Sequence, residues 1–213
     1  MSPSQAHSPT PEHEDSRKKR GPGRPIDLAK RQAVVDATLE LLAEVGYGAL
    51  TIDSVAQRAG SNRVLVYRVW DSKVALVRDV LFGTAAELVV PDTGSVVEDL
   101  RSYVAQHVAR MSHPAYVRGV PGLTIELLSD PELSRDTHRR FIAPSEEGFA
   151  TIFERADDRG ELSARPDPKV VTYVVSGTTT GLAQSTRLSE TAITEVLMQT
   201  LVGGLVHLSG TNR

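Results

Sequence analysis

The segment "RAGSNRVLVYRVWDSKVAL", residues 58–76, combines an Ala-Gly pair with closely spaced cationic, aromatic and apolar side chains. Asn62 can cap a helix over about 63–70, because its side chain can accept a hydrogen bond from a free backbone N–H. On that helix Val66 and Trp70 lie four residues apart and share a face that we expect to be buried. The opposite face, which we expect to be exposed, carries Arg63, Val64, Tyr67 and Arg68.

Two further helices are predicted upstream of this segment. Between Leu28 and Val45 apolar residues recur at the spacing of one helix face, and Gly46 follows as a C-terminal stop. Thr51 can cap a short second helix, and Gly60 supplies the turn that ends it. Two short helices joined by a glycine turn and packed on a longer helix form a helix-turn-helix, whose second short helix can enter a DNA major groove.

Downstream of the segment, "WDSK" offers Asp71 or Ser72 as the cap of a fourth helix. Lys73 then lies in the first turn of that helix, near the expected path of a DNA backbone. The cations and the phenol of the exposed face would meet phosphates and base edges, while the apolar residues would hold the helix on its support. The unit over residues 28–82 is therefore a predicted DNA-binding domain.

Charge is distributed unevenly along the chain, whose net charge is −3. Residues 17–82 carry 12 bases and 7 acids, whereas residues 83–213 carry 12 bases and 17 acids. A basic N-terminal part indicates a polyanion-binding module, with a solvated charged face as the alternative. Residues 1–27 are rich in Ser, Pro, Gly and charge without helical or strand period, so we expect a disordered basic arm. Arg20 and Arg24 in "RGPGRP" are candidates for a minor groove, and a solubilising tail is the alternative.

The composition excludes several classes of protein. The chain has 213 residues, 40% of them hydrophobic, which is enough for a buried core. Cysteine is absent, so disulfides, thiolate metal sites and cysteine nucleophiles are excluded. No run of about 18 apolar residues occurs, and the first 32 residues contain no apolar core of a signal peptide. We expect a cytoplasmic protein.

Residues 83–213 are predicted to form further helices with apolar stripes. The first stripe is Leu100, Tyr103, Val104, His107, Val108 and Met111. The second, interrupted by Pro144 and stopped by Gly160, is Phe141, Phe149, Ile152, Phe153 and Ala156. The third is Val170, Val171, Val174, Gly177, Thr178, Gly181 and Leu182. The last, which is expected to lie on the longest helix, is Ile193, Val196, Leu197, Thr200, Leu201, Gly204, Leu205 and Leu208. No sheet is required, and the fold class is all-α.

On these residues the chain resembles the tetracycline-repressor (TetR) family of bacterial transcriptional regulators. The resemblance rests mainly on "AVVDATLELLAEVGYGALTIDSVAQRAGSNRVLVYRVWDSKVALVRDVL", residues 33–81. It implies an N-terminal three-helix DNA-binding domain, a palindromic operator, and a C-terminal domain that binds a small molecule and forms a homodimer. By position, Arg63, Val64 and Leu65 would face bases, and Tyr67 and Lys73 would touch phosphates. Further DNA contacts are expected at Thr51, Asn62 and Arg68.

Candidate ligand and dimer residues lie on the C-terminal stripes. We expect a mostly apolar effector pocket lined by Tyr103, His107, Met111, Phe141, Phe149 and Tyr173. A hydrogen-bonded core residue is the alternative for His107. For the dimer interface, which the resemblance favours over packing within one subunit, the candidates are Val174, Gly177, Gly181, Val196, Thr200 and Gly204.

Other kinds of site find little support in the sequence. "GYGALT" at residues 46–51 has a G-x-G but no third glycine and no preceding strand, so a dinucleotide site is not expected. The six histidines are scattered, so neither a metal nor a cofactor is expected. We predict a ligand-responsive regulator, a repressor rather than an enzyme. A helical small-molecule-binding enzyme and a nonspecific DNA-coating protein are the alternatives.

Overall fold

The computed structural model describes residues 28–83, 88–205 and 207–208. Its N-terminal part contains α1 (Leu28–Ala49), α2 (Ile52–Arg58), α3 (Arg63–Tyr67), α4 (Lys73–Arg78) and the π-helical turn η1 (Asp79–Gly83). Then follow α5 (Val96–Ser112), α6 (Pro114–Ser129), α7 (Pro131–Thr137), the π-helical turn η2 (His138–Ile142) and α8 (Ala143–Asp158). The last elements are β1 (Leu162–Ala164), α9 (Pro168–Ser185), α10 (Glu190–Thr200), the π-helical turn η3 (Leu201–Leu205) and β2 (His207–Leu208). The predicted all-α fold is confirmed, with one short antiparallel pairing of β1 and β2 added.

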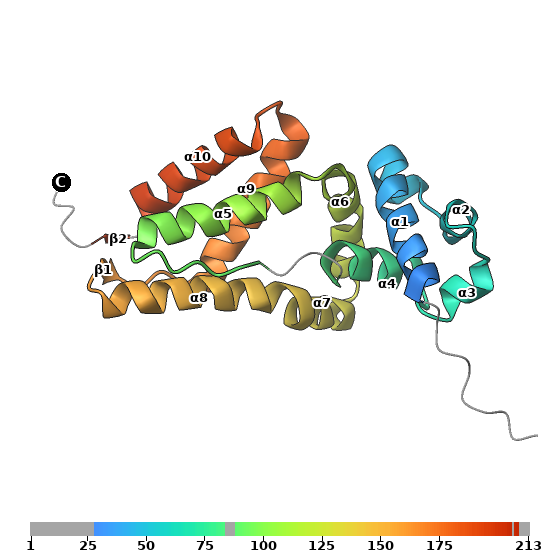
Figure 1. Ribbon diagram of the computed structural model, residues 1–213, viewed down its shortest axis with the longest axis horizontal. Coiled ribbons are helices and arrows are strands. Elements are labelled where there is room, and N and C mark those ends of the chain that lie inside the picture. Colours follow the sequence, from blue (N-terminus) through green and yellow to red (C-terminus); the bar gives the residue numbers. More distant parts are fainter. Residues whose placement is uncertain (1–27, 84–87, 206, 209–213) are drawn as a thin grey trace, which may run out of the picture.

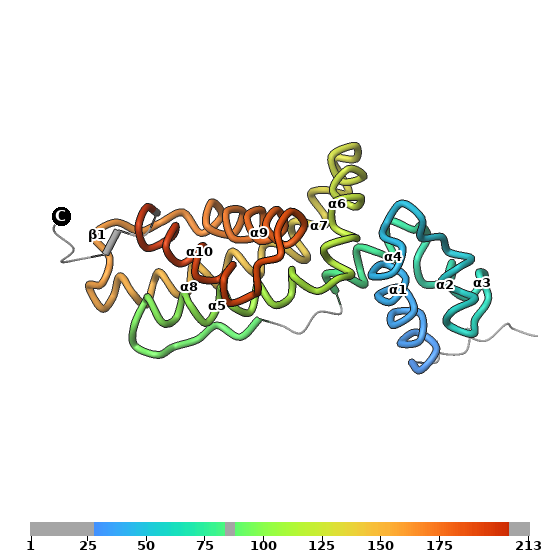
Figure 2. Tube along the Cα trace, turned by 90° about the horizontal axis from the view of Figure 1, so that it is seen from above, coloured from blue at the N-terminus to red at the C-terminus, as the bar shows by residue number. Residues whose placement is uncertain are grey.

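The molecule is elongated, with the N-terminal helices at one end and α5, α8, α9 and α10 at the other (Figure 1). Helix α6 stands between the two groups and lies beside α1, its main packing partner. Seen from above, the end of α6 projects beyond the layer that α9 and α10 form (Figure 2). The position of α2 and α3 therefore depends on α1, which is fixed against α6.

Side-chain caps define the starts of the short N-terminal helices, as predicted. Thr51 accepts from Ser54 N at 3.1 Å and begins α2, while Asn62 accepts from Leu65 N at 3.0 Å and begins α3. Of the two candidates in "WDSK", Ser72 is the cap, and its hydroxyl accepts from Ala75 N at 3.1 Å. Each cap satisfies a backbone N–H that a helix start otherwise leaves free.

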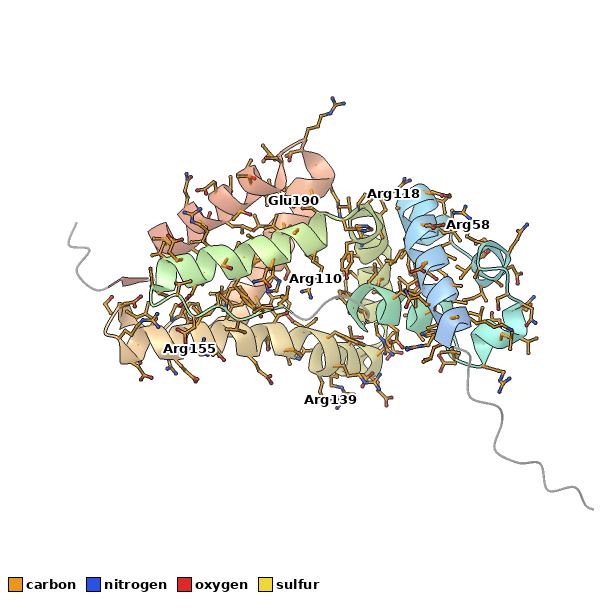
Figure 3. The ribbon with its side chains drawn as sticks, viewed as in Figure 1. Arg58, Arg110, Arg118, Arg139, Arg155 and Glu190 are labelled. Atoms are coloured by element: carbon orange, nitrogen blue, oxygen red, sulfur yellow. The ribbon has the colours of Figure 1, made fainter. Side chains whose placement is uncertain are left out.

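The C-terminal end of α1 is a junction between the two halves of the molecule. Gly46 has φ 76°, so it breaks the regular helix where the sequence predicts a stop, and one irregular turn follows. Arg118 of α6 donates to Ala43 O and Glu44 O at 2.9 and 2.8 Å, satisfying carbonyls at this helix end. On the other side Arg58 of α2 forms a two-point pair with the Glu44 carboxylate at 2.9 and 2.8 Å. Figure 3 labels Arg118 and Arg58 near this end of α1.

The first hydrophobic core unites the N-terminal helices with α6. It contains buried residues of α1 to α4 and η1, and also Met111, Ala115, Tyr116 and Leu123 from the end of α5 and from α6. A Cβ at Gly122 would lie 2.4 Å from the Tyr47 ring, so α6 and α1 approach closely only because that position is glycine. Packing thus continues across the predicted domain boundary between residues 82 and 83.

The second hydrophobic core lies among α5, α8, α9 and α10. Most residues of the predicted stripes of α5 and α8 are buried here, including Tyr103, Phe149 and Phe153 at 1% exposure or less. Phe141 is half-buried in η2, and Met111 belongs to the first core. Pro144 lies in the first turn of α8, directly after η2, and Gly160 follows the end of α8 with φ 69°. The predicted interruption and stop of this second stripe are therefore confirmed.

The buried residues of α9 are Val171, Thr172, Val175 and Thr179, whereas Gly177 and Gly181 of the predicted stripe are exposed. The predicted stripe shares Val171 with the buried side and otherwise runs along its edge and the exposed side of the helix. One prediction about the last helix is wrong. The final helix ends at Thr200 and continues as η3, where Gly203 and Gly204 lower helix propensity. Leu208 therefore belongs to β2 and not to a helix.

Candidate nucleic-acid interface and ligand cavity

Helix α3 has one anchored face and one exposed face. Val66 and Trp70 are 1% and 2% exposed within the first core, whereas Val64 is 65% exposed and Tyr67 44%. Arg63 and Arg68 are also exposed. The predicted division of faces is confirmed. The helix is shorter than predicted, since the N–H groups of both Val69 and Trp70 bond to Val66 O and tighten the chain before the cap of α4.

Arg63 has an acidic neighbour that sequence reasoning missed. Its Nε lies 3.5 Å from Asp53 Oδ1 of α2, and its guanidinium lies 5.8 Å from the centre of the Tyr67 ring. Both groups of the Arg63–Asp53 pair are mostly exposed, so the pair is weak and can be exchanged for another partner. The three side chains form one exposed surface over α2 and α3.

The other predicted DNA-contacting residues have mixed environments. Lys73 Nζ donates to Tyr47 O at 2.7 Å and lies 4.1 Å from the centre of the Tyr47 ring, so its ammonium already binds the end of α1. The oxygens of Thr51 and Asn62 act as helix caps, although both residues are exposed. Leu65 is half-buried. Arg20 and Arg24 lie outside the described residues.

A cavity of about 370 Å³ lies where η1, α5 and the η2–α8 junction meet. Its apolar lining is Phe82, Gly83, Leu88, Val90, Phe141 and Pro144. Its polar lining is Tyr103, Arg110, Arg140 and Ser145. A volume of this size is at the lower end of the range of small-molecule sites, roughly 300–1,000 Å³.

Of the six predicted ligand residues, Tyr103 and Phe141 line this cavity. Phe149 and His107 lie behind Tyr103 in the core, where the rings of Tyr103 and Phe149 are 4.8 Å apart. Met111 is buried in the first core. The expectation that Tyr173 faces the same space is wrong, because it is 50% exposed on the outer side of α9.

His107 is enclosed by aromatic rings and one cation. It is 1% exposed, and its ring centre lies 5.0 Å from that of Tyr103 and 5.5 Å from that of Phe149. Its Nδ1 lies 3.5 Å from Arg110 Nη2, and its Nε2 has no hydrogen-bond partner in the described part of the chain. Burial, with a smaller contribution from Arg110, lowers the pKa of His107 to about 3. The ring is therefore neutral near pH 7 and belongs to the core behind the cavity wall.

Arg110 and Arg140 are cavity residues that the sequence analysis missed. Arg110 follows Tyr103 by seven positions and His107 by three, so all three share one side of α5. A cation at that position of an apolar stripe was the signal in the sequence. The sequence gives a weaker signal for Arg140, because this residue lies in the irregular turn η2, where helical spacing does not apply.

Most of the candidate dimer residues lie on the exposed sides of α9, α10 and η3. Gly177, Gly181 and Gly204 have no atom of the described chain within 4 Å of an added Cβ. Val196 is 40% exposed, Thr200 is exposed, and Val174 packs partly on the second core. Packing of the α9 glycines against another helix of the same subunit is therefore excluded within the described residues.

The described residues form neither a metal-binding cluster nor a membrane-spanning helix. No group of three or more His, Cys, Asp or Glu side chains could hold a metal ion in the part of the chain that the structure describes. No helix in the described ranges has the length and apolar character needed to cross a membrane.

Comparison with known proteins identifies both halves of the chain. Residues 34–80 match the family model of bacterial regulatory proteins of the tetR family, and residues 90–205 match that of the tetracyclin repressor-like C-terminal domain. The helix-turn-helix (HTH)-type transcriptional regulator YdeS of Bacillus subtilis is 32% identical over 161 residues, which cover 73% of this chain and 78% of that protein. The HTH-type regulator AqdR of Rhodococcus erythropolis is 30% identical, covering 69% and 70%.

A solved structure shows the same fold over most of the chain. It is the transcriptional regulator FadR from Bacillus subtilis in complex with stearoyl-CoA, with a TM-score of 0.60 and 16% identity, covering 82% of this chain and 99% of that one. The matched families consist of DNA-binding regulators and not of enzymes. The chain therefore belongs to the tetracycline-repressor (TetR) family and is a helix-turn-helix transcriptional regulator.

Proposed function

We propose that this regulator is a homodimeric repressor that binds a two-fold symmetric operator through α3 and is released by a small, largely apolar effector. The observation that carries the proposal is the two-sided structure of α3. Val66 and Trp70 fix the helix in the first core, and the exposed side presents Arg63, Tyr67 and Arg68. Such a helix can enter a major groove without losing its support. A regulator of this kind acts on chromosomal DNA, so the proposal includes a cytoplasmic location.

The proposed dimer uses the outer side of α9 and α10. Exposed apolar and glycine residues follow this surface, and no element of the described chain covers Gly177 or Gly181. A two-fold dimer presents two copies of α3, which for adjacent major-groove half-sites must lie about 34–36 Å apart or at a compatible multiple.

We propose that an effector in the cavity acts on α3 through α4. Phe82 of η1, which directly continues α4, packs on Phe141 of η2, and both rings line the cavity with centres 6.1 Å apart. In addition Arg78 of α4 pairs with Asp136 of α7 at 3.2 Å. An effector between Phe82 and Phe141 would shift η1 and α4, and with them the support of α3.

Release of DNA requires the effector to bind the non-DNA-binding conformation more tightly. For typical coupling the difference is about 1–3 kcal/mol, and DNA must weaken effector binding by the same factor. This reciprocity gives the proposal a second readout, since operator duplex added to the protein should lower effector affinity.

Selection of bound duplexes from a random pool tests the proposed function. We expect a palindrome whose half-site spacing matches the dimer. A nonspecific DNA-coating protein would show no preference between recovered and random duplexes. Recovery of only asymmetric or random sequences would contradict the proposal.

A further inference from the structure

The cavity wall is mostly apolar, yet two arginines contribute to it. Arg110 enters from the last turn of α5 and Arg140 from η2, while the apolar side is formed by rings and aliphatic groups such as Phe82 and Phe141. Figure 3 shows Arg110 near the centre of the molecule, at the C-terminal end of α5. A cation in such a place is costly unless an anion or several acceptors meet it.

Arg110 has no anionic partner among the described residues. Among the described residues, no carboxylate lies within ion-pair distance of Arg110 and its Nε has no hydrogen-bond partner. Within the same residues its side chain has a polar contact with His107 Nδ1, at 3.5 Å. Burial lowers the pKa of the guanidinium, which reflects this uncompensated charge. Arg110 nevertheless remains protonated near pH 7, because arginine starts from a very high pKa.

Arg78 shows how the same chain treats a buried arginine that has a structural task. It is 8% exposed, and two carboxylates neutralise it, Asp79 at 3.0 Å and Asp136 at 3.2 Å. Arg159 is likewise surrounded by Asp92, Asp99 and Glu161. Arg110 is half-buried and, unlike Arg78 and Arg159, has no carboxylate partner among the described residues.

His107 contacts Arg110 on the side away from the cavity. A guanidinium only donates, so the 3.5 Å contact makes Nδ1 the acceptor and leaves the ring proton on Nε2. A neutral imidazole offers an acceptor but no counter-charge. The neutral ring of His107 therefore contacts the guanidinium without neutralising it, and the charge stays available to the cavity.

We propose that the cavity binds a small organic anion, with an apolar body against Phe82 and Phe141 and a carboxylate against Arg110 and Arg140. This inference rests on the proposed function, in which the same cavity is the effector site. The planar guanidinium matches a carboxylate with two parallel donors, which adds direction as well as charge. Arg140 is more exposed and lies 3.6 Å from Asp136, so it contributes less than Arg110.

Matched acids and amides test the inference by isothermal titration calorimetry on the full chain without DNA. The probes are octanoate with octanamide and naphthoate with naphthamide, whose members differ in charge and little in shape. We expect each acid to bind roughly tenfold to a hundredfold more tightly than its amide, the value of a hydrogen bond to a charged group. Octyl phosphate is added to the panel, and it should bind more weakly than octanoate if the anion is a carboxylate.

Variants test whether the preference for acid over amide depends on the two cavity arginines. Arg110→Met should remove most of the preference for acid, Arg110→Lys should keep part of it, and Arg140→Met should reduce it less. Arg139→Met is the matched control, because Arg139 is next to Arg140 in sequence, is 75% exposed and does not line the cavity. Circular dichroism checks that each variant is folded.

The outcomes separate this inference from the proposed function. Equal affinity for acid and amide, a preference that survives Arg110→Met, or no binding of any acid would overturn the anion site. Operator release is measured separately by fluorescence anisotropy on the selected duplex. Acids that bind through Arg110 without releasing the operator would support the anion site and contradict the effector role. Release by neutral compounds alone, acting in this cavity, would support the effector role and overturn the anion site.

Discussion

The two hydrophobic cores differ in how they treat buried polar side chains. In the first core Thr38 donates to Val34 O at 2.7 Å and Arg78 is paired with two carboxylates, while Trp70 Nε1 lacks a partner. In and beside the second core, unpartnered buried atoms include His107 Nε2, Arg110 Nε and Thr179 Oγ1. An unsatisfied buried polar group costs about 1–3 kcal/mol. Among the described residues, the second core and its border therefore forgo more of this stability than the first core, where Trp70 Nε1 is the one example named.

The difference follows from what each core supports. The first core must hold α3 in one position against α1 and α6, which favours dense packing and local caps. The second core borders the cavity, where open hydrogen-bonding capacity can be used by a bound molecule. Substitutions in each core and on the surface next to it test this difference.

Trp70→Ala should have the largest effect. Removing a buried aromatic side chain costs about 3–5 kcal/mol, a large part of the total stability of a domain. We expect the loss in urea denaturation, together with loss of operator binding. Tyr67→Ala is the control, because Tyr67 is 44% exposed on the other side of α3. It should change stability by no more than about 0.5 kcal/mol. An equal loss of stability in both variants would contradict the assignment of faces.

Gly122→Ala tests whether α6 belongs to the first core. The new Cβ would lie 2.4 Å from the Tyr47 ring, so α6 and α1 must separate at a cost of about 1–3 kcal/mol, toward the upper end. Urea denaturation measures this cost. A stability equal to that of the unchanged protein would show that α1 and α6 are not tightly packed.

Gly181→Leu is the counterpart on the outer side of α9. Its Cβ meets no atom of the described chain within 4 Å, so the isolated subunit should tolerate it. In the proposed dimer the leucine should overpack the seam by about 1–3 kcal/mol and shift the protein toward monomer with loss of operator binding. Sedimentation measures this shift, and Gly181→Ala controls for the gain in helix propensity. A dimer of undiminished stability would place the seam elsewhere.

His107 should make the second core sensitive to acid. Its folded pKa of about 3 lies below its unfolded value of about 6.5, so the folded protein excludes a proton that the unfolded chain binds. The stability from this group is therefore complete above pH 6.5 and is lost as the pH falls toward 3. Between pH 7.5 and pH 5 the loss should be about 2 kcal/mol.

His107→Leu isolates this effect. Leucine has a similar size, carries no titratable group and leaves no N–H without a partner. We expect the variant to lose about 2 kcal/mol less than the unchanged protein over the same pH interval, measured by urea denaturation at each pH. Identical pH dependence in the two proteins would show that His107 takes up a proton in the folded state.

Local features of the first core were accessible from the sequence. Thr51, Asn62 and Ser72 are caps because of their own side chains and the residues that directly follow, and the Gly46 stop depends on one backbone angle. The faces of α3 follow from a four-residue spacing. Such features require no knowledge of distant parts of the chain, which explains why they were predicted correctly.

Features of the second core depend on long-range contacts and were predicted less well. Helix α9 has valines on both sides, so its buried face is decided by α5 and α8 and not by its own pattern. The placement of Tyr173 was wrong for that reason. Whether Arg110 has an ion-pair partner depends on which residues of other elements surround it. The sequence pattern of α5 therefore could not predict that no described carboxylate lies close to it.

Arg63→Ala should have the smallest effect. It tests whether α3, held by the first core, reads a base of the operator through Arg63. A bidentate contact of arginine with guanine is worth about 1–3 kcal/mol of discrimination. Because Asp53 lies 3.5 Å from Arg63 in the free protein, part of that value offsets the loss of this pair. We expect a loss of about 1 kcal/mol in binding free energy, with relaxed preference at one base position.

Lys73→Ala should instead weaken all duplexes alike and lower the salt slope by roughly one if its ammonium leaves Tyr47 O for a phosphate. Both variants are compared by fluorescence anisotropy on the selected operator and its single-base variants at several salt concentrations. Weaker binding of Arg63→Ala without any change in base preference would identify Arg63 as a phosphate contact, whereas an unchanged salt slope for Lys73→Ala would leave Lys73 as a support for the end of α1.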